Sequence, residues 1–299
     1  MAKRVALFIL TNALVIFTIS LIMGVLGVGP YLSRYGLNYT SLAIFCGLFG
    51  VVGSFISLAL SKKTAKWFMG VRTIPDNPRD PELRFVLDTV ERLSHKANLK
   101  AVPEVGIYDS DDVNAFATGP SQNNSLVAVS TGMLDNLDRE ELEGVLAHEI
   151  AHIENGDMIT MTLLQGVVNA FVMFAARVVA WGLMTALGEE EGGGISWLAY
   201  MLVVLVLEMV FMVFGMLVIS GFSRFREYRA DEGGARLAGR DKMLAALKAL
   251  QDIVPDADVE QGHPSVQAFQ INGEPRFLRF FSSHPPLDKR IERLQGFRG

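Results

Sequence analysis

Four apolar stretches constrain the fold of this chain more than any other feature of its sequence. They run roughly over residues 5–28, 41–60, 161–187 and 197–222. Each is long enough to cross a bilayer, which takes about 20 residues in a helix. Backbone groups in hydrocarbon must satisfy one another, so a span of this kind has to be helical. The sequence therefore predicts an α-helical membrane protein with four transmembrane helices.

The first stretch is better explained as an uncleaved anchor than as a signal peptide. Lys3 and Arg4 precede it, as basic residues precede a secretory signal. However, the stretch is long, no Ala-x-Ala cleavage site follows it, and a second apolar stretch comes soon after. We therefore expect it to remain in the mature chain.

Basic residues flanking the spans predict their orientation, because cytoplasmic loops carry an excess of Lys and Arg. Residues 29–40 hold only Arg34 as a basic residue, and residues 188–196 hold three glutamates and no basic residue. The segments that we expect in the cytoplasm contain more basic residues: Lys3 and Arg4 before the first span, Lys62, Lys63, Lys66 and Arg72 after the second, and Arg224, Arg226 and Arg229 after the fourth. Both termini and both large polar regions should face the cytoplasm.

The spans divide the chain into four regions. These are an N-terminal transmembrane hairpin (1–60), a polar region (61–160), a second transmembrane hairpin (161–222) and a final polar region (223–299). Periodicity and turn signals in the polar regions predict strands over 102–108, 113–118 and 126–130, and helices from Asp80 and Asp138 and over 229–238, 242–253 and 285–294. We expect one α+β domain assembled from the two polar regions.

The pattern His148-Glu149-x-x-His152 is the strongest indication of a chemical activity in this sequence. Histidines four residues apart project from the same face of a helix. Two neutral imidazoles so placed can bind one zinc ion, and Glu149 can polarise or deprotonate a water molecule beside it. The pattern is typical of zinc hydrolases that act on peptide bonds. The alternative is a helix that carries two histidines by chance.

Local signals place this pattern inside a bounded helix. Asp138 is a good N-cap, and Glu141 three residues later completes a capping-box-like start. Apolar residues recur at helical spacing from Leu142 to Ile153, and Asn155-Gly156 supplies a stop.

A zinc hydrolase usually takes three protein ligands and leaves a fourth position for water. The single cysteine, Cys46, lies in an apolar stretch, so a carboxylate is the natural third ligand. Glu227 and Asp231 share one helical face, so Glu227 could bind the metal while Asp231 holds a ligating histidine by its other nitrogen. The alternative is a solvated, charged helix beside the membrane. His95 and His263 have no partner at ligand spacing.

Two charges inside the apolar stretches also need a partner. Arg177 and Glu208 lie about 11 and 12 residues from the two ends of one short connection, hence at similar depth on neighbouring antiparallel spans. Isolated charges there are costly, so we predict that the two side chains pair or share a polar cavity. A pair that only fixes the register of the spans is favoured over a role in substrate passage.

Taken together, four motifs resemble the HtpX family of integral-membrane zinc metalloproteases, which are gluzincins related to the eukaryotic CAAX prenyl protease. The motifs are His148-Glu149-x-x-His152, Glu227-x-x-x-Asp231, Asn114-Ala115-Phe116-Ala117-Thr118-Gly119 and Ser283-His284-Pro285. The resemblance covers essentially the whole chain. It implies a zincin-like cytoplasmic catalytic domain and an inner-membrane endopeptidase (class EC 3.4.24) that cleaves misfolded or damaged membrane proteins during stress.

The resemblance also implies a role for each matching residue. His148, His152 and Glu227 would bind one Zn²⁺ per chain, and Glu149 would be the general base. Asp231 would orient an imidazole, and His284 would steady the developing oxyanion or else merely cap a helix. Asn114, Ala115, Phe116 and Ala117 would lie on the edge strand that binds extended substrate, or on an ordinary hairpin.

The partners that follow are membrane-protein and unfolded polypeptide substrates, the lipid bilayer, and other membrane quality-control proteases as candidates. A net charge of −5 gives no sequence-wide basic character that would indicate nucleic acid.

Two other function classes stay open at this point. Zinc could serve as a structural clamp in a protein without catalysis, although a closed site needs four ligands and the sequence offers no obvious fourth side chain. A transporter or channel could be argued from Arg177 and Glu208, but the chain shows no internal repeat or interrupted span.

Overall fold

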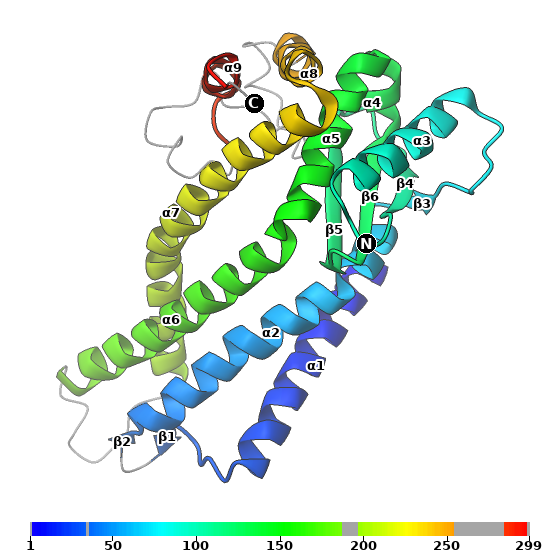
Figure 1. Ribbon diagram of the computed structural model, residues 1–299. Helices are drawn as coiled ribbons and strands as arrows, with labels where there is room; N and C mark the ends of the chain where they lie inside the picture. The colour runs from blue at the N-terminus through cyan, green and yellow to red at the C-terminus, as the bar shows by residue number, and fades with distance from the viewer. Residues whose placement is uncertain (1, 34–35, 187–196, 254–283, 298–299) are drawn as a thin grey trace. The chain divides into compact units, whose positions relative to one another are not determined.

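The computed structural model describes residues 2–33, 36–186, 197–253 and 284–297 of the chain (Figure 1). These residues form two compact units. The first comprises Met1–Ser57 and Met161–Ile219, and the second comprises Leu58–Thr160 and Ser220–Gly299. The chain passes from one unit to the other along single helices, because α2 (Tyr39–Phe68), α6 (Asp157–Ala186) and α7 (Trp197–Ala238) each extend from one into the other.

The first unit is built from apolar helices. It holds α1 (Ala2–Val25), a small antiparallel hairpin of β1 (Leu32–Ser33) and β2 (Gly36–Leu37), and the apolar parts of α2, α6 and α7. Within the described residues, α2, α6 and α7 are long and apolar enough to cross a membrane, and Leu14–Val25 of α1 is a shorter apolar segment. The chain is therefore a mostly helical, multi-pass membrane protein, and the span predicted over residues 5–28 stays a prediction.

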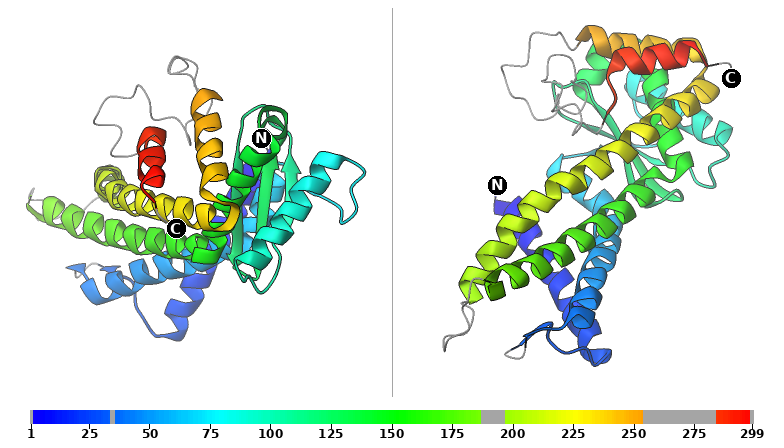
Figure 2. Two further views of the ribbon diagram at one scale, coloured as in Figure 1. Left: turned by 45° about the horizontal axis from the view of Figure 1, so that its top comes forward. Right: turned by 90° about the vertical axis from the view of Figure 1, so that its left-hand side faces the viewer.

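Small residues let α2 and α6 lie side by side, as both ribbon figures show (Figures 1 and 2). A Cβ added at Gly50 would lie 2.9 Å from the Cβ of Ala170, so the two backbones nearly touch there. The Ser54 hydroxyl lies 2.6 Å from the Gly50 carbonyl oxygen and 3.0 Å from that of Thr162 on the other helix. Close approach and interhelical hydrogen bonds are what hold helices together in lipid, where the hydrophobic effect does not act between them.

Two charged side chains of this unit, Arg177 and Glu208, face each other. Arg177 Nη1 of α6 donates to Glu208 Oε1 of α7 over 2.5 Å and to the Met173 carbonyl oxygen over 3.0 Å. The Tyr200 hydroxyl donates to the Arg177 carbonyl oxygen over 3.4 Å. The pair thus links α6 to α7.

The second unit contains a four-stranded sheet in the order β3-β4-β6-β5. Its strands are β3 (Arg72–Thr73), β4 (Glu104–Tyr108), β5 (Ala115–Ser121) and β6 (Asn124–Ser130). The central pair β4–β6 is parallel, whereas β3–β4 and β5–β6 are antiparallel. Strand β5 is consequently an edge strand, whose outer backbone groups have no neighbouring strand among the described residues.

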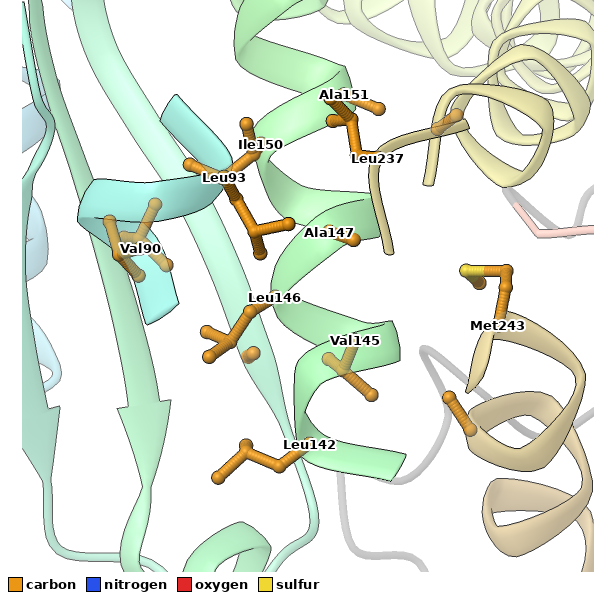
Figure 3. Packing of buried hydrophobic residues seen from close by; sticks show 14 of the residues in the cluster. Val90, Leu93, Leu142, Val145, Leu146, Ala147, Ile150, Ala151, Leu237 and Met243 are labelled. Carbon is orange, nitrogen blue, oxygen red and sulfur yellow. The ribbon is translucent and has the colours of Figure 1, made fainter. Parts of the chain in front are cut away.

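Helix α5 (Arg139–Asn155) is the centre of the core of this unit. Figure 3 shows it between α3 (Pro81–Lys96) on one side and the end of α7 with α8 (Arg240–Ile253) on the other. Leu146, Ala147 and Ile150 of α5 are fully buried, as are Val90 and Leu93 of α3. A helix surrounded in this way cannot shift without disturbing the whole core, since protein interiors are close-packed.

The observed elements differ from the predicted ones in several places. The predicted helix 229–238 is the last part of α7, which runs unbroken for 42 residues, because no proline interrupts it after the span. Helix α4 (Thr131–Asn136) was not predicted; its six residues are too few for a periodic signal, and Ser130 caps it by accepting from the Met133 amide. The last helix, α9, covers Leu287–Gln295.

Candidate metal centre

Helix α5 holds the histidine pair in place from both ends. At its start, Asp138 accepts from the amides of Glu140 and Glu141, and the Glu141 side chain accepts from the Asp138 amide, which completes a capping box. At its end, Gly156 adopts the left-handed conformation, with φ of 69°, that glycine accepts without strain. His148 and His152 are consequently fixed on the buried helix, each only 7% exposed.

Glu227 of α7 brings a carboxylate to the two imidazoles. Glu227 Oε2 lies 3.4 Å from His148 Nε2, Glu227 Oε1 lies 3.4 Å from His152 Nε2, and the two Nε2 atoms are 3.1 Å apart. A tetrahedral zinc ion with ligands at its usual bond lengths separates its ligand atoms by roughly 3.3 Å. The three side chains, whose candidate ligand atoms all lie within 4.8 Å of one another, therefore fit one such ion.

Glycines allow Glu227 to come this close. A Cβ on Gly233 would lie 2.7 Å from the Ala151 Cβ of α5, and one on Gly234 would lie 3.2 Å from the His148 amide nitrogen. Glu227 is upstream on the same face of α7 and is fully buried, at 0% exposure. The Gly233-Gly234 step thus sets the separation between α7 and the helix that carries the histidines.

Each imidazole is held by a carboxylate on its other nitrogen. His148 Nδ1 lies 3.0 Å from Asp231 Oδ1, and His152 Nδ1 lies 2.7 Å from Asp157 Oδ2. When Nδ1 donates its proton to these acceptors, both Nε2 lone pairs point towards the same space. Two lone pairs at 3.1 Å repel each other unless a cation lies between them. The donor set is thus suited to a metal ion.

The electrostatics of the cluster favour an added positive charge, which a proton or a metal ion can supply. Burial alone would lower the pKa of His148, but hydrogen bonds to Asp231 and Glu227 raise this pKa to about 9. Burial would raise the pKa of Glu227, yet the His284 charge and hydrogen bonds from the three histidines hold that pKa well below its usual range. The Glu227 carboxylate therefore stays ionised and provides negative charge for a cation.

A cavity of about 330 Å³ opens beside these ligands. Glu149, 9% exposed, lines it together with the two histidines, and α8 provides an apolar wall. His284 lines it as well, with its Nδ1 2.9 Å from Glu227 Oε2. A polypeptide in this cavity would lie between an acidic, metal-binding wall and an apolar one.

The edge of the sheet also reaches the cavity. Asn114, Ala115, Phe116 and Ala117 line it, where β5 begins. The inner side of β5 pairs with β6, with Ala115 opposite Val129 and Ala117 opposite Val127. An extended peptide could add to the outer side by backbone hydrogen bonding.

The profile of peptidase family M48 matches residues 82–298, which include every residue of this centre. The chain belongs to peptidase family M48. Membership together with the apolar helices makes it a membrane metalloprotease, whose substrates are polypeptides.

Relatives of this M48 peptidase match it along almost its whole length. Protease HtpX of Shewanella oneidensis is 50% identical over 296 residues, covering 98% of this chain and 99% of the relative. Protease HtpX of Shewanella denitrificans is 50% identical over 298 residues, with the same coverage. The crystal structure of S. mikatae Ste24p has a similar fold, with a TM-score of 0.64, at 16% identity; the match covers 98% of this chain and 64% of that one.

Two residues of the M48 centre escaped the sequence analysis. Asp157 follows the Gly156 cap and holds His152; its only local signal is an acidic residue directly after the helix stop. Arg290 of α9 is buried at 3% exposure and donates two hydrogen bonds to Asp231. Its signal is an arginine on the apolar face formed by Leu287, Ile291 and Leu294.

Other candidate residues lie apart from this centre. Arg177 and Glu208 belong to the apolar unit. His95 is exposed and lies 3.8 Å from Glu91, and His263 lies outside the described residues. Within the described part of the chain, only His148, His152 and Glu227 form a group of three candidate metal ligands.

Proposed function

We propose that this M48 metalloprotease is a zinc endopeptidase (class EC 3.4.24) that cleaves misfolded or damaged proteins of the inner membrane from the cytoplasmic side. Two histidines and one carboxylate at tetrahedral separations, with Glu149 beside them, are the observation that carries this proposal. Among the described residues only these three are candidate ligands, and a set of three leaves a coordination position for water or substrate, which favours catalysis over a structural clamp.

Each residue of the site then has a task. His148, His152 and Glu227 would hold the zinc ion, which would supply a water molecule of lowered pKa and a polarised carbonyl oxygen. Glu149 accepts the proton of the attacking water and delivers it to the leaving amine. His284 donates to the carbonyl oxygen as negative charge develops there. Asp231 and Asp157 keep His148 and His152 in the tautomer that presents Nε2.

Substrate binding follows from the edge strand. We propose that an extended segment pairs with the outer side of β5 at Asn114–Ala117, and that this pairing orients its scissile bond. Backbone hydrogen bonds depend little on the side chains of the substrate, which suits a protease that cleaves damaged proteins of many sequences. A single apolar wall, formed by Leu247 and its neighbours on α8, would then favour apolar residues near the cleaved bond.

We propose four membrane spans, with residues 5–28 as the first, and a zincin-like cytoplasmic domain assembled from residues 61–160 and 223–299. The basic residues at the two cytoplasmic connections and the acidic connection at 188–196 support this orientation. Residues 1–60 and 161–222 would form the two transmembrane hairpins. Other membrane quality-control proteases are candidate partners, because they would meet the same damaged substrates.

The decisive test replaces the general base and leaves the ligands in place. Glu149→Gln should bind zinc at the wild-type stoichiometry, because it leaves both histidines and Glu227 intact. It should lose at least 10²-fold of the cleavage rate, since proton transfer by a positioned group contributes about that much or more. Zinc content and casein cleavage are measured on the same detergent preparation.

The matched control is Glu154→Gln, an exposed glutamate on the same helix. It should keep both zinc and activity. Full activity in Glu149→Gln, or absence of zinc from the wild-type protein, would remove the proposal.

A further inference from the structure

Arg290 is a buried cation on a short helix near the end of the chain. It lies on the inner face of α9 among Leu287, Ile291 and Leu294, and only 3% of it is exposed. Burying a guanidinium group is costly unless hydrogen bonds and opposite charges compensate for lost water. A long basic side chain could avoid this cost by extending its charged end to solvent. Arg290 instead points inward and lines the cavity. Its position calls for a specific partner.

That partner is the carboxylate which holds His148. Arg290 Nε donates to Asp231 Oδ2 over 2.9 Å, and Nη2 donates to Asp231 Oδ1 over 2.6 Å. This two-point contact fixes the plane of the carboxylate, as paired Arg–carboxylate hydrogen bonds do. The same Oδ1 atom lies 3.0 Å from His148 Nδ1. Arg290 and His148 thus share one acceptor atom, whose direction Arg290 sets.

Two further distances connect Arg290 to the ligands. Its Nη2 lies 3.4 Å from His148 Nδ1, and its Nη1 lies 3.8 Å from Glu227 Oε2. An arginine cannot accept a hydrogen bond, so both it and the Nδ1–H group donate to Asp231. The guanidinium also offsets part of the negative charge of Asp231 and Glu227. Its contacts extend to two of the three candidate metal ligands.

We infer that Arg290 is a positioning residue of the metal centre, which fixes Asp231 and through it the His148 imidazole. The inference rests on the proposed zinc site. It makes α9 a part of that site, although the helix contributes no ligand itself. Metal affinity should then depend on a side chain 142 residues away from His148 in sequence.

Arg293 provides a matched control on the same helix. Its Nε and Nη2 donate to Glu232 Oε1 over 3.2 and 3.0 Å, and its guanidinium carbon lies 4.7 Å above the Tyr228 ring. It therefore also fastens α9 to α7, but its side chain is 53% exposed and its partner Glu232 contacts no candidate ligand in the described residues. Arg293→Gln removes only a contact between α9 and α7, whereas Arg290→Gln removes the hydrogen bonds that orient Asp231.

The experiment measures zinc affinity by chelator competition on the full chain in detergent, in the Glu149→Gln background, where a protease should no longer cleave its own copies. Arg290→Gln should weaken zinc binding on the order of 10- to 100-fold, as loss of residues behind a ligand does. Arg290→Lys keeps the charge but loses the planar guanidinium group. Its zinc affinity should therefore lie between that of Arg290→Gln and that of the parent. Arg293→Gln should stay within about twofold of the parent. The visible spectrum of the Co²⁺-loaded protein should shift in Arg290→Gln and not in Arg293→Gln.

A double variant tests the route through Asp231. If Arg290 acts through this carboxylate, Arg290→Gln should weaken zinc binding less than twofold further in an Asp231→Asn background. Parental affinity and cobalt spectrum in Arg290→Gln, an equal loss in Arg293→Gln, or an additive loss in the double variant would each overturn the inference. If Arg290→Gln does not fold, parental affinity in Arg290→Lys overturns it instead. Absence of zinc from the parent would refute the proposed function itself.

Discussion

At the scale of single residues, the direction of a hydrogen bond decides what the histidine pair can bind. A carboxylate on Nδ1 of each ring leaves Nε2 as the acceptor, and the two Nε2 atoms lie 3.1 Å apart. Removing one such carboxylate would let the ring change tautomer or rotate. We therefore expect the residues behind the candidate ligands to affect metal affinity strongly.

Asp157→Asn tests this for His152. The asparagine keeps the size of the side chain, but its amide can present a donor to Nδ1 and so favour the wrong tautomer. We expect zinc affinity to fall on the order of 10- to 100-fold, measured by chelator competition in the Glu149→Gln background. Glu154→Gln, three residues earlier and exposed, is the control and should bind as the parent does. Unchanged affinity in Asp157→Asn would show that His152 does not depend on this carboxylate.

At the scale of helices and strands, the separation of α5 and α7 sets the geometry of the metal centre. Glu227 and the histidines come from different helices, and Gly233 faces Ala151 where these two helices meet. A side chain there must push the helices apart, because backbone and Cβ atoms cannot yield as a flexible side chain can.

Gly233→Ala should therefore destabilise the protein by about 1–3 kcal/mol and weaken zinc binding at the same time. A Cβ at this position would lie 2.7 Å from the Ala151 Cβ. Gly221→Ala, on the same helix, is the control: the nearest atom to its new Cβ is 3.9 Å away, at the end of the Arg224 side chain. Thermal unfolding with and without added zinc measures both effects. Equal stability of the two variants would contradict this account of the helix contact.

A cluster of charged residues outside the metal centre links the end of α2 to the sheet. Glu104 of β4 forms an ion pair with Lys62 at 2.9 Å and another with Lys66, and accepts from the Thr73 hydroxyl over 2.5 Å. Burial would raise the pKa of Glu104, but the hydrogen bonds from Lys66, Thr73 and Lys62 lower it to about 2. The cluster should thus stabilise the second unit only while Glu104 is ionised.

The sign of the pH dependence follows from this depressed pKa. Glu104 contributes its full stabilisation above its unfolded pKa, near 4.5, and loses it as the pH falls towards about 2. Glu104→Gln should accordingly lower the melting temperature at pH 7, and the difference from wild type should shrink between pH 4.5 and pH 3. Glu140→Gln, exposed at the start of α5, should show no such convergence. A difference that stays constant over this range would mean that the ion pairs contribute nothing measurable.

At the scale of the whole molecule, features that depend on neighbouring residues could be predicted from the sequence. Contacts between residues far apart in the chain could not. The bounds of α5 followed from Asp138, Glu141 and Gly156, because capping depends on neighbours within one turn. The central parts of the strands followed from alternation and turn residues in the same way. Arg290 could not be assigned, since its partner Asp231 lies on another helix, and nothing in the sequence around it reveals that contact.

The candidate site shows the same division. His148 and His152 lie four residues apart within one helix, so their common face could be predicted from spacing alone. Glu227 came from the expected chemistry of a third ligand, and its distance from the pair could not be predicted before α7 was seen to pack on α5 through Gly233 and Gly234. Membrane orientation is a third kind of inference, because it depends on charges along the entire chain.

That orientation makes a prediction which single cysteines can test. Cys46 is buried in α2, so Cys46→Ala gives a background without reactive thiols. In this background Thr40→Cys, exposed at the end of the connection 29–40, should react with a membrane-impermeant maleimide in intact spheroplasts. Lys100→Cys, exposed in the loop after α3, should react only once the membrane is permeabilised. The opposite labelling would place the metal centre outside the cytoplasm, where it could not act on damaged proteins from the side that we propose, whatever its affinity for zinc.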